Sequence, residues 1–340
     1  MAADYNLDSV LQLIGESHFA AAVAKFEALG APDLSPAGAL KVSKAYKKLH
    51  NFHGETEILQ STLDDTRNRN AIWPIMEAKL VRGLGRALMR VERWDDALRH
   101  WFELCTKFEP TRNDLLALLA CAHRTNKLAS VHDIMDQLSD EFGAHFAPKE
   151  LELLSSNADF PAELKPGLYV VGGGNGAGKT AIGDFLAALG LRVINTDTEV
   201  AEYEYSGVFN KSPTDFQGNA NKAKFVWPKP TIERFRQRAM DQGCALVLCG
   251  WASNSSRLVD LATCCVYLRV PMPERIRRLQ QREPRRWREG SPDYERLMSR
   301  AGKSARRVGM NVVENTDSIG EVSGAVLELF RQRSEHHRLS

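Results

Sequence analysis

The sequence lacks the features that mark membrane and exported proteins. No stretch of about 18 consecutive apolar residues occurs in its 340 residues, so we predict no membrane-spanning helix and no membrane partner. The first eight residues contain no basic segment followed by an apolar one, so we expect no signal peptide. These two absences predict a cytoplasmic protein.

Paired cysteines and a strong net charge are also missing. The six cysteines include no C-x-x-C pair followed by a second pair or by histidines, which argues against a zinc site. Most of them lie in apolar runs, where we expect buried, reduced thiols. The formal net charge of +2 gives no overall attraction to nucleic acid or to a membrane surface. We therefore do not favour a nucleic-acid partner.

A glycine-rich loop is the most informative feature that is present. The apolar run at 168–171 predicts a strand, and residues 181–189 have a helical pattern. Between them, Gly173 to Thr180 satisfy the Walker A spacing G-x-x-x-x-G-K-[ST]. Glycine permits the φ angles with which successive backbone N–H groups turn toward one phosphate, and the new helix adds its own N-terminal N–H groups. An accidental match would not explain why the strand, the loop and the helix all agree.

This loop predicts a nucleotide-phosphate site. We expect Lys179 to reach the β- and γ-phosphates of ATP, and the Thr180 hydroxyl to be the ligand of Mg²⁺. The predicted cofactor-binding residues of the loop are Gly173, Gly174, Asn175, Gly176, Ala177, Gly178, Lys179 and Thr180.

The length suits two domains, and the composition changes near residue 143. Residues 1–142 are helical in pattern, and their clearest unit contains Leu84-Gly85, Ala97, Trp101 and Pro110. This unit resembles a tetratricopeptide repeat, which implies a domain that docks a protein partner or forms oligomers. An ordinary helical bundle is the alternative. Residues 143–166, with three prolines and one short helical piece at 149–154, predict a linker before a second domain at 167–335.

The second domain alternates apolar runs with helical patterns. Runs at 191–194, 244–250, 264–270 and 311–314 predict strands, and residues 231–242 and 322–333 predict helices between or after them. This alternation is typical of an α/β domain whose parallel sheet is covered by helices on both faces. Ligands of such sheets bind at the carboxyl ends of the strands. The phosphate loop, Asp197 and Gly250 all follow strands and therefore predict one cleft.

Asp197 is the candidate catalytic base. It follows a predicted strand, where a carboxylate can orient and deprotonate an acceptor hydroxyl. No acid follows the apolar run at 245–249, so the ordinary Walker B carboxylate is missing and Asp197 becomes the acid expected near the metal. The alternative is that Asp197 only caps the helix that begins after the strand.

An arginine-rich stretch follows the strand predicted at 264–270. Pro284, Gly290 and Pro292 predict a mobile loop at 283–292, which suits a lid over the site. We predict that Arg282 and Arg285 bind the nucleotide, since guanidinium groups suit phosphate contacts. The alternative is a solvated basic face or a surface for nucleic acid.

Residues 167–335 resemble the small P-loop metabolite kinases of the shikimate kinase and adenylate kinase group. The similarity lies in the phosphate loop, in the pattern Val266-Tyr267-Leu268 followed by Pro271, and in the arginine-rich stretch. The resemblance implies transfer of a phosphoryl group from ATP to a hydroxyl. It also implies a lid arginine at Arg285, a substrate-anchoring arginine at Arg300 and an acceptor contact at Asp197.

Three departures from that pattern affect the metal and acceptor sites, and one of them is that no F-R-x-x-E motif precedes the strand predicted at 244–250. Asn195 stands where the group has the first acid of a D-x-D motif, and Gly250-Trp251-Ala252 stands where a triple glycine is expected. We therefore do not expect shikimate as the acceptor. The predicted catalytic residues are Asp197, Lys179 and Arg285, and the predicted substrate-binding residues are Asp197, Gly250 and Arg300.

The sequence leaves three functions open. The first is an ATP-dependent kinase (a phosphotransferase with an alcohol acceptor) that acts on a small metabolite or sugar and carries a helical docking domain. The second is a nucleotide-regulated interaction protein in which ATP binding acts as a switch. The third is a nucleic-acid end kinase that uses the arginine cluster.

Overall fold

The computed structural model describes residues 2–69, 73–125, 128–156, 160–210, 216, 222–300, 310–315 and 318–336. The chain divides into two compact units, one formed by residues 1–146 with 202–224 and the other by residues 147–201 with 225–340. The first contains paired helices and the second a parallel sheet with helices, so the predicted fold class is confirmed. The domain boundaries at 142 and 167 stay a prediction.

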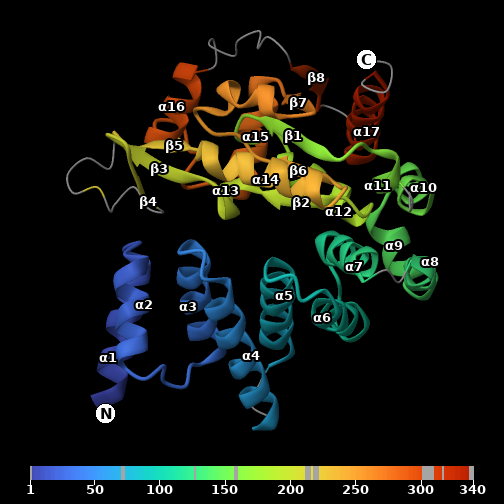
Figure 1. Cartoon of the computed structure of the whole chain (residues 1–340). Helices are drawn as coiled ribbons and strands as arrows, with labels where there is room; N and C mark the ends of the chain where they lie inside the picture. Colours follow the sequence, from blue (N-terminus) through green and yellow to red (C-terminus); the bar gives the residue numbers. More distant parts are fainter. Residues whose placement is uncertain are drawn as a thin grey trace. The chain divides into compact units, whose positions relative to one another are not determined.

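The first unit consists mainly of helices that pack in consecutive pairs (Figure 1). Helix α1 packs on α2, α3 on α4, α5 on α6 and α7 on α8. A short antiparallel hairpin of β3 (Glu202–Tyr205) and β4 (Val208–Asn210) also belongs to this unit. The helices are α1 (Ala2–Gly15), α2 (Phe19–Ala28), α3 (Pro36–Lys48), α4 (Phe52–Asn68), α5 (Pro74–Arg90), α6 (Trp94–Lys107), α7 (Arg112–Arg124), α8 (Leu128–Gln137) and α9 (Ser139–His145).

Small residues explain the close packing of α5 on α6. A Cβ atom at Gly85 would lie 2.7 Å from Cε2 of Trp101, whose side chain is fully buried. Ala97, one turn before Trp101 on α6, is also fully buried. Side chains this small let two helices approach while a large aromatic ring fills the space beside them.

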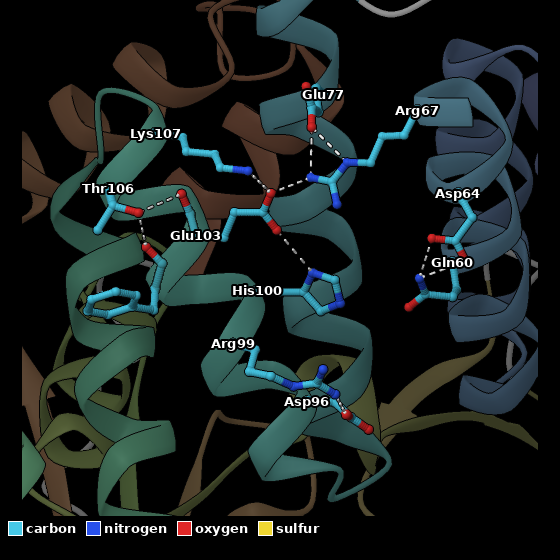
Figure 2. A network of polar contacts seen from close by, with 11 residues as sticks. Gln60, Asp64, Arg67, Glu77, Asp96, Arg99, His100, Glu103, Thr106 and Lys107 are labelled. Carbon is cyan, nitrogen blue, oxygen red and sulfur yellow. Dashed lines mark hydrogen bonds and ion pairs between the residues drawn. The ribbon is translucent and has the colours of Figure 1, made fainter. Parts of the chain in front are cut away.

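Ion pairs join helices of different pairs. Arg67 on α4 lies 2.7 Å from a carboxylate oxygen of Glu77 on α5 and 2.6 Å from one of Glu103 on α6 (Figure 2). Arg82 on α5 donates two hydrogen bonds, of 2.8 and 2.7 Å, to the buried carboxylate of Asp114 at the start of α7. These charged groups therefore connect each helix pair to the next one along the chain.

The second unit is an α/β domain. No helix in the described parts of the whole chain has both the length and the apolar character needed to cross a membrane. Two short 3-10 helices occupy Ser255–Arg257 and Val259–Leu261. The strands of its sheet are β1 (Gly167–Gly173), β2 (Arg192–Asn195), β6 (Ala245–Cys249), β7 (Cys264–Arg269) and β8 (Asn311–Glu314), and β5 (Lys224–Val226) contains the point at which the chain passes from the first unit to the second. The helices are α10 (Pro148–Ser156), α11 (Phe160–Glu163), α12 (Lys179–Ala188), α13 (Thr196–Glu199), α14 (Lys229–Asp241), α15 (Met272–Arg282), α16 (Pro292–Arg300) and α17 (Ile319–His336).

The sheet has the order β2-β6-β1-β7-β8, and its neighbouring strands pair in parallel. Leu168 and Val170 of β1 pack with α14, whereas Tyr169 packs on Phe330 of α17 with ring centroids 4.7 Å apart. Successive residues of a strand point to opposite faces, so helices cover both faces of the sheet. Strand β1 is central: β6 and β2 lie on one side of it, and β7 and β8 on the other. The strand order therefore changes direction at β1, and sheets of this kind bind ligands at the carboxyl end of the strands at such a point.

Helix α10 belongs to the α/β unit although it lies in the stretch predicted as a linker. Its Glu150 is buried, and the two carboxylate oxygens accept hydrogen bonds from the backbone N–H groups of Ala147 (2.9 Å) and Gly320 (3.1 Å). One carboxylate therefore caps the N-termini of α10 and α17 together.

Candidate functional site

The predicted phosphate loop connects β1 to α12. Gly176 and Gly178 have φ angles of 76° and 83°, a left-handed conformation that other residues adopt only with strain. The N–H of Ala177 donates to the carbonyl of Gly174 at 3.1 Å, which closes the turn. The glycines are therefore required by the shape of the loop.

Several backbone N–H groups of the loop remain available to a ligand. Within the described parts of the chain, no acceptor is bonded to the N–H groups of Gly176, Gly178, Lys179 or Thr180. Three of these groups stand at the N-terminus of α12, where the helix dipole also favours negative charge. The loop thus fits an anion with several oxygens.

Lys179 adds a cation to this loop. Its side chain is half-buried, and its ammonium donates a 3.1 Å hydrogen bond to the carbonyl of Gly174. Burial lowers the pKa of Lys179 below its ordinary value, and the nearby charge of Asp197 opposes that fall. A desolvated ammonium is stabilised by an anion, so the lysine and the loop N–H groups favour the same kind of ligand.

Asp197 lies beside Gly250, at the carboxyl ends of β2 and β6. A Cβ atom at the buried Gly250 would overlap the Thr196 side chain and lie 2.9 Å from a carboxylate oxygen of Asp197. The Thr196 hydroxyl donates to the Cys249 carbonyl at 3.2 Å and so ties α13 to β6. Asp197 itself is exposed, at the second position of α13.

The alternative role of Asp197 as a helix N-cap is wrong. The residue in the N-cap position of α13 is Asn195, which has extended backbone geometry. Asp197 lies inside the first turn instead, so its carboxylate is not needed as the cap residue. Its position beside Gly250, from which its charge acts on Lys179, remains the feature that calls for explanation.

The end of β6 has no acidic side chain. Cys249 occupies it, fully enclosed, and burial raises the pKa of its thiol. The next residues bring an aromatic cluster instead: Trp251 lies over Gly172, with ring centroids 5.4 Å from Tyr267 and 6.4 Å from the buried Trp227. This cluster gives the sheet edge beside the phosphate loop an apolar wall.

Two polar residues that were not among the predicted site residues contact the loop. Asn315, buried just after β8, donates from Nδ2 to the Ala177 carbonyl at 2.6 Å. Arg275 on α15 donates from Nε to the Asn175 carbonyl at 2.9 Å. Arg275 precedes the buried Leu279 by four residues, so the two share one helix face, and this spacing was a usable signal in the sequence.

The predicted lid arginines are more exposed. Arg282 ends α15 and lies 3.4 Å from Glu283, while Arg285 is exposed in the segment 283–292. This segment is anchored by Trp287, which is buried against Leu279 and Leu297 and whose carbonyl accepts a 3.2 Å hydrogen bond from Gln280.

Arg278 on α15 donates to a carboxylate oxygen of Glu274 at 2.6 Å and to the carbonyl of Asn315 at 3.1 Å. Arg300 ends α16, and its side chain lies outside the described residues. The geometry therefore brings together the loop, Lys179, Asp197 and Gly250, with Arg282 near enough for its charge to lower the pKa of Lys179.

Comparison with protein-family models gave no match, and comparison with curated proteins gave none either. Within the described residues, no group of three or more His, Cys, Asp and Glu side chains is arranged to hold a metal ion.

Proposed function

We propose that this chain is an ATP-dependent phosphotransferase that acts on a hydroxyl of a small metabolite or sugar. The observation that carries the proposal is the place of the exposed Asp197 carboxylate, which lies beside Gly250 at the end of β6, next to the strand that leads into the phosphate loop and Lys179. The charge of Asp197 acts on Lys179, and Gly250 leaves room for that carboxylate at the same edge of the sheet. A phosphoryl-transfer site needs both parts: cations and N–H groups for phosphate, and a group that receives the proton of the attacking hydroxyl.

The site residues have two kinds of role: some would bind the nucleotide, and one would act on the acceptor hydroxyl. ATP, when bound with Mg²⁺, supplies the phosphoryl group. Lys179 and the loop N–H groups would hold its phosphates, and the Thr180 hydroxyl would bind Mg²⁺. Asp197 would orient the acceptor and take its proton, while Arg282 and Arg285 would cover the nucleotide.

The resemblance to P-loop metabolite kinases supports this proposal at residues 167–335. The strand order β2-β6-β1-β7-β8, with the glycine loop after the central strand, suits a nucleotide site at that edge. For the helical unit we propose tetratricopeptide-like docking of a protein partner, supported by its helix pairs and by the α5–α6 contact at Gly85 and Trp101.

The test is an acceptor screen with the purified full chain, ATP and Mg²⁺. The panel contains monosaccharides, cyclic and linear polyols, hydroxy acids and a 5′-hydroxyl oligonucleotide, and mass spectrometry detects phosphorylated products. We expect one class of small hydroxylated acceptor to gain 80 Da, the mass of HPO₃. Lys179→Ala, the matched control, should lower that turnover about 10²–10³-fold.

Three other results would redirect the proposal. ATP binding with no product from any acceptor would favour a nucleotide-regulated interaction protein. Product formation only on the oligonucleotide would favour a nucleic-acid end kinase. Equal turnover in Lys179→Ala and the unmodified chain would remove the site assignment.

A further inference from the structure

Arg275 on α15 contacts the phosphate loop directly. Its Nε bonds the Asn175 carbonyl, and its guanidinium occupies the space beside Gly174, where a Cβ atom would lie 2.8 Å from Cζ. A Cβ atom at Gly176 would lie 3.0 Å from the backbone oxygen of Arg275. Glycines at 174 and 176 therefore leave room for α15 and its arginine against the loop.

The charge of Arg275 has no anionic partner in the described parts of the chain. The neighbouring Glu274 is bonded to Arg277 and Arg278 instead. Arg275 is half-buried, and burial lowers the pKa of its guanidinium. A half-buried guanidinium without a counter-ion is costly, and an anionic ligand would remove that cost.

Arg275 and Lys179 converge on one residue of the loop. The Lys179 ammonium bonds the Gly174 carbonyl at 3.1 Å, and the Arg275 guanidinium lies beside Gly174. The charge of Arg275 also contributes to lowering the pKa of Lys179. In a loop of this type the lysine reaches the β- and γ-phosphates, so the terminal phosphates of a bound triphosphate would lie within reach of Arg275.

We propose that Arg275 binds the terminal phosphates of a nucleoside triphosphate, from α15 rather than from the lid segment. The inference rests on the proposed phosphate site. Nε stays on the Asn175 carbonyl while the terminal N–H groups of the guanidinium donate to phosphate oxygens. Because that bond already orients the side chain, little conformational freedom is lost on binding.

The experiment measures dissociation constants of the full chain with Mg²⁺ by calorimetry, for ATP, inorganic tripolyphosphate and AMP. Arg275→Gln should weaken ATP and tripolyphosphate binding about 10- to 100-fold and change AMP binding little, because AMP lacks the terminal phosphates. Arg275→Lys, which keeps the charge, should lose less affinity for ATP and tripolyphosphate than Arg275→Gln does. The matched control is Arg277→Gln on the same helix, where the exposed Arg277 is paired with Glu274, and its affinities should equal those of the unmodified chain.

The contrary outcomes are distinct. If Arg275 only holds α15 against the loop and does not bind phosphate, Arg275→Gln lowers the affinities for ATP and AMP by the same factor, and the inference fails. If Arg275→Gln binds ATP as tightly as the unmodified chain, the inference also fails while the proposed function stands. If the unmodified chain binds neither ATP nor tripolyphosphate, the proposed function and the inference fail together.

Discussion

Asp114 has its carboxylate fully buried between α5 and α7. Burial alone would raise the pKa of Asp114, but hydrogen bonds from Arg82 and from the backbone and hydroxyl of Thr111 outweigh it and lower the pKa. A group whose pKa is lower in the folded state stabilises the fold above its unfolded pKa, about 3.9 for aspartate. That stabilisation is lost as the pH falls through the lower, folded pKa.

Asp114→Asn should therefore destabilise the helical unit in a pH-dependent way. At pH 7 the change leaves Arg82 without its counter-ion, and we expect a loss of about 3 kcal/mol in the free energy of unfolding. Urea unfolding followed by helical circular dichroism at pH 7 and pH 3 measures it, and the difference from the unmodified chain should shrink at pH 3. Asp133→Asn, an exposed aspartate on α8, is the control. An equal difference at both pH values would contradict the account.

Which single residues meet at the site was only partly predictable. Lys179 and the loop glycines follow from local spacing, because strand, loop and helix are continuous in sequence. Arg275 was not predicted as a site residue: its spacing from the apolar Leu279 placed both on one helix face, but the sequence did not show that this face meets the loop. Asn315 contacts Ala177 across 138 positions, and no local pattern specifies such a pair.

Two glycines on α5 give the helix packing a direct test. A Cβ atom at Gly85 would strike the Trp101 ring, whereas one at Gly83 would make ordinary contacts of 3.5 Å with Leu40 and Leu59. At both positions alanine favours the helical conformation over glycine by about 1 kcal/mol, so this contribution cancels in the comparison. Gly85→Ala should therefore be less stable than Gly83→Ala by about 1–3 kcal/mol, the cost of overpacking. Thermal melts of the two variants decide it, and equal melting temperatures would count against the packing described.

At the scale of elements, the hydrophobic periodicity of the sequence was sufficient to predict most strands and helices of the α/β unit. The predicted strand at 311–314 matches β8, and the predicted helix at 231–242 matches α14 within two residues at each end. The segment 143–166 was predicted as a linker with one helical piece at 149–154; α10 confirms that piece, and the segment also contains α11. Its prolines begin helices instead of breaking them: Pro148 is the first residue of α10, and Pro161 lies in the first turn of α11.

At the scale of the whole molecule, α10 decides where the α/β unit can be separated from the rest. Glu150 caps both α10 and α17, so a fragment that starts at Asn157 loses two hydrogen bonds that a fragment starting at Ala147 keeps. We expect the 147–340 fragment to be more stable than the 157–340 fragment by about 2 kcal/mol or more. Thermal melts of the two fragments test this, and Glu150→Ala in the full chain should reproduce part of the loss. A 157–340 fragment that melts at the same temperature would show that α10 does not support the sheet unit.

The central claim is that Asp197 and Lys179 serve one phosphoryl transfer, and Asp197→Asn tests it most directly. The change keeps the shape of the side chain and removes its charge. Once an acceptor is identified, turnover should fall about 10²–10⁴-fold, the usual contribution of a general base. ATP affinity should change much less, because Lys179 and the loop N–H groups hold the phosphates. The measurement is the rate of acceptor phosphorylation beside the ATP dissociation constant of the same variant. Undiminished phosphorylation would contradict the account and exclude Asp197 as the base.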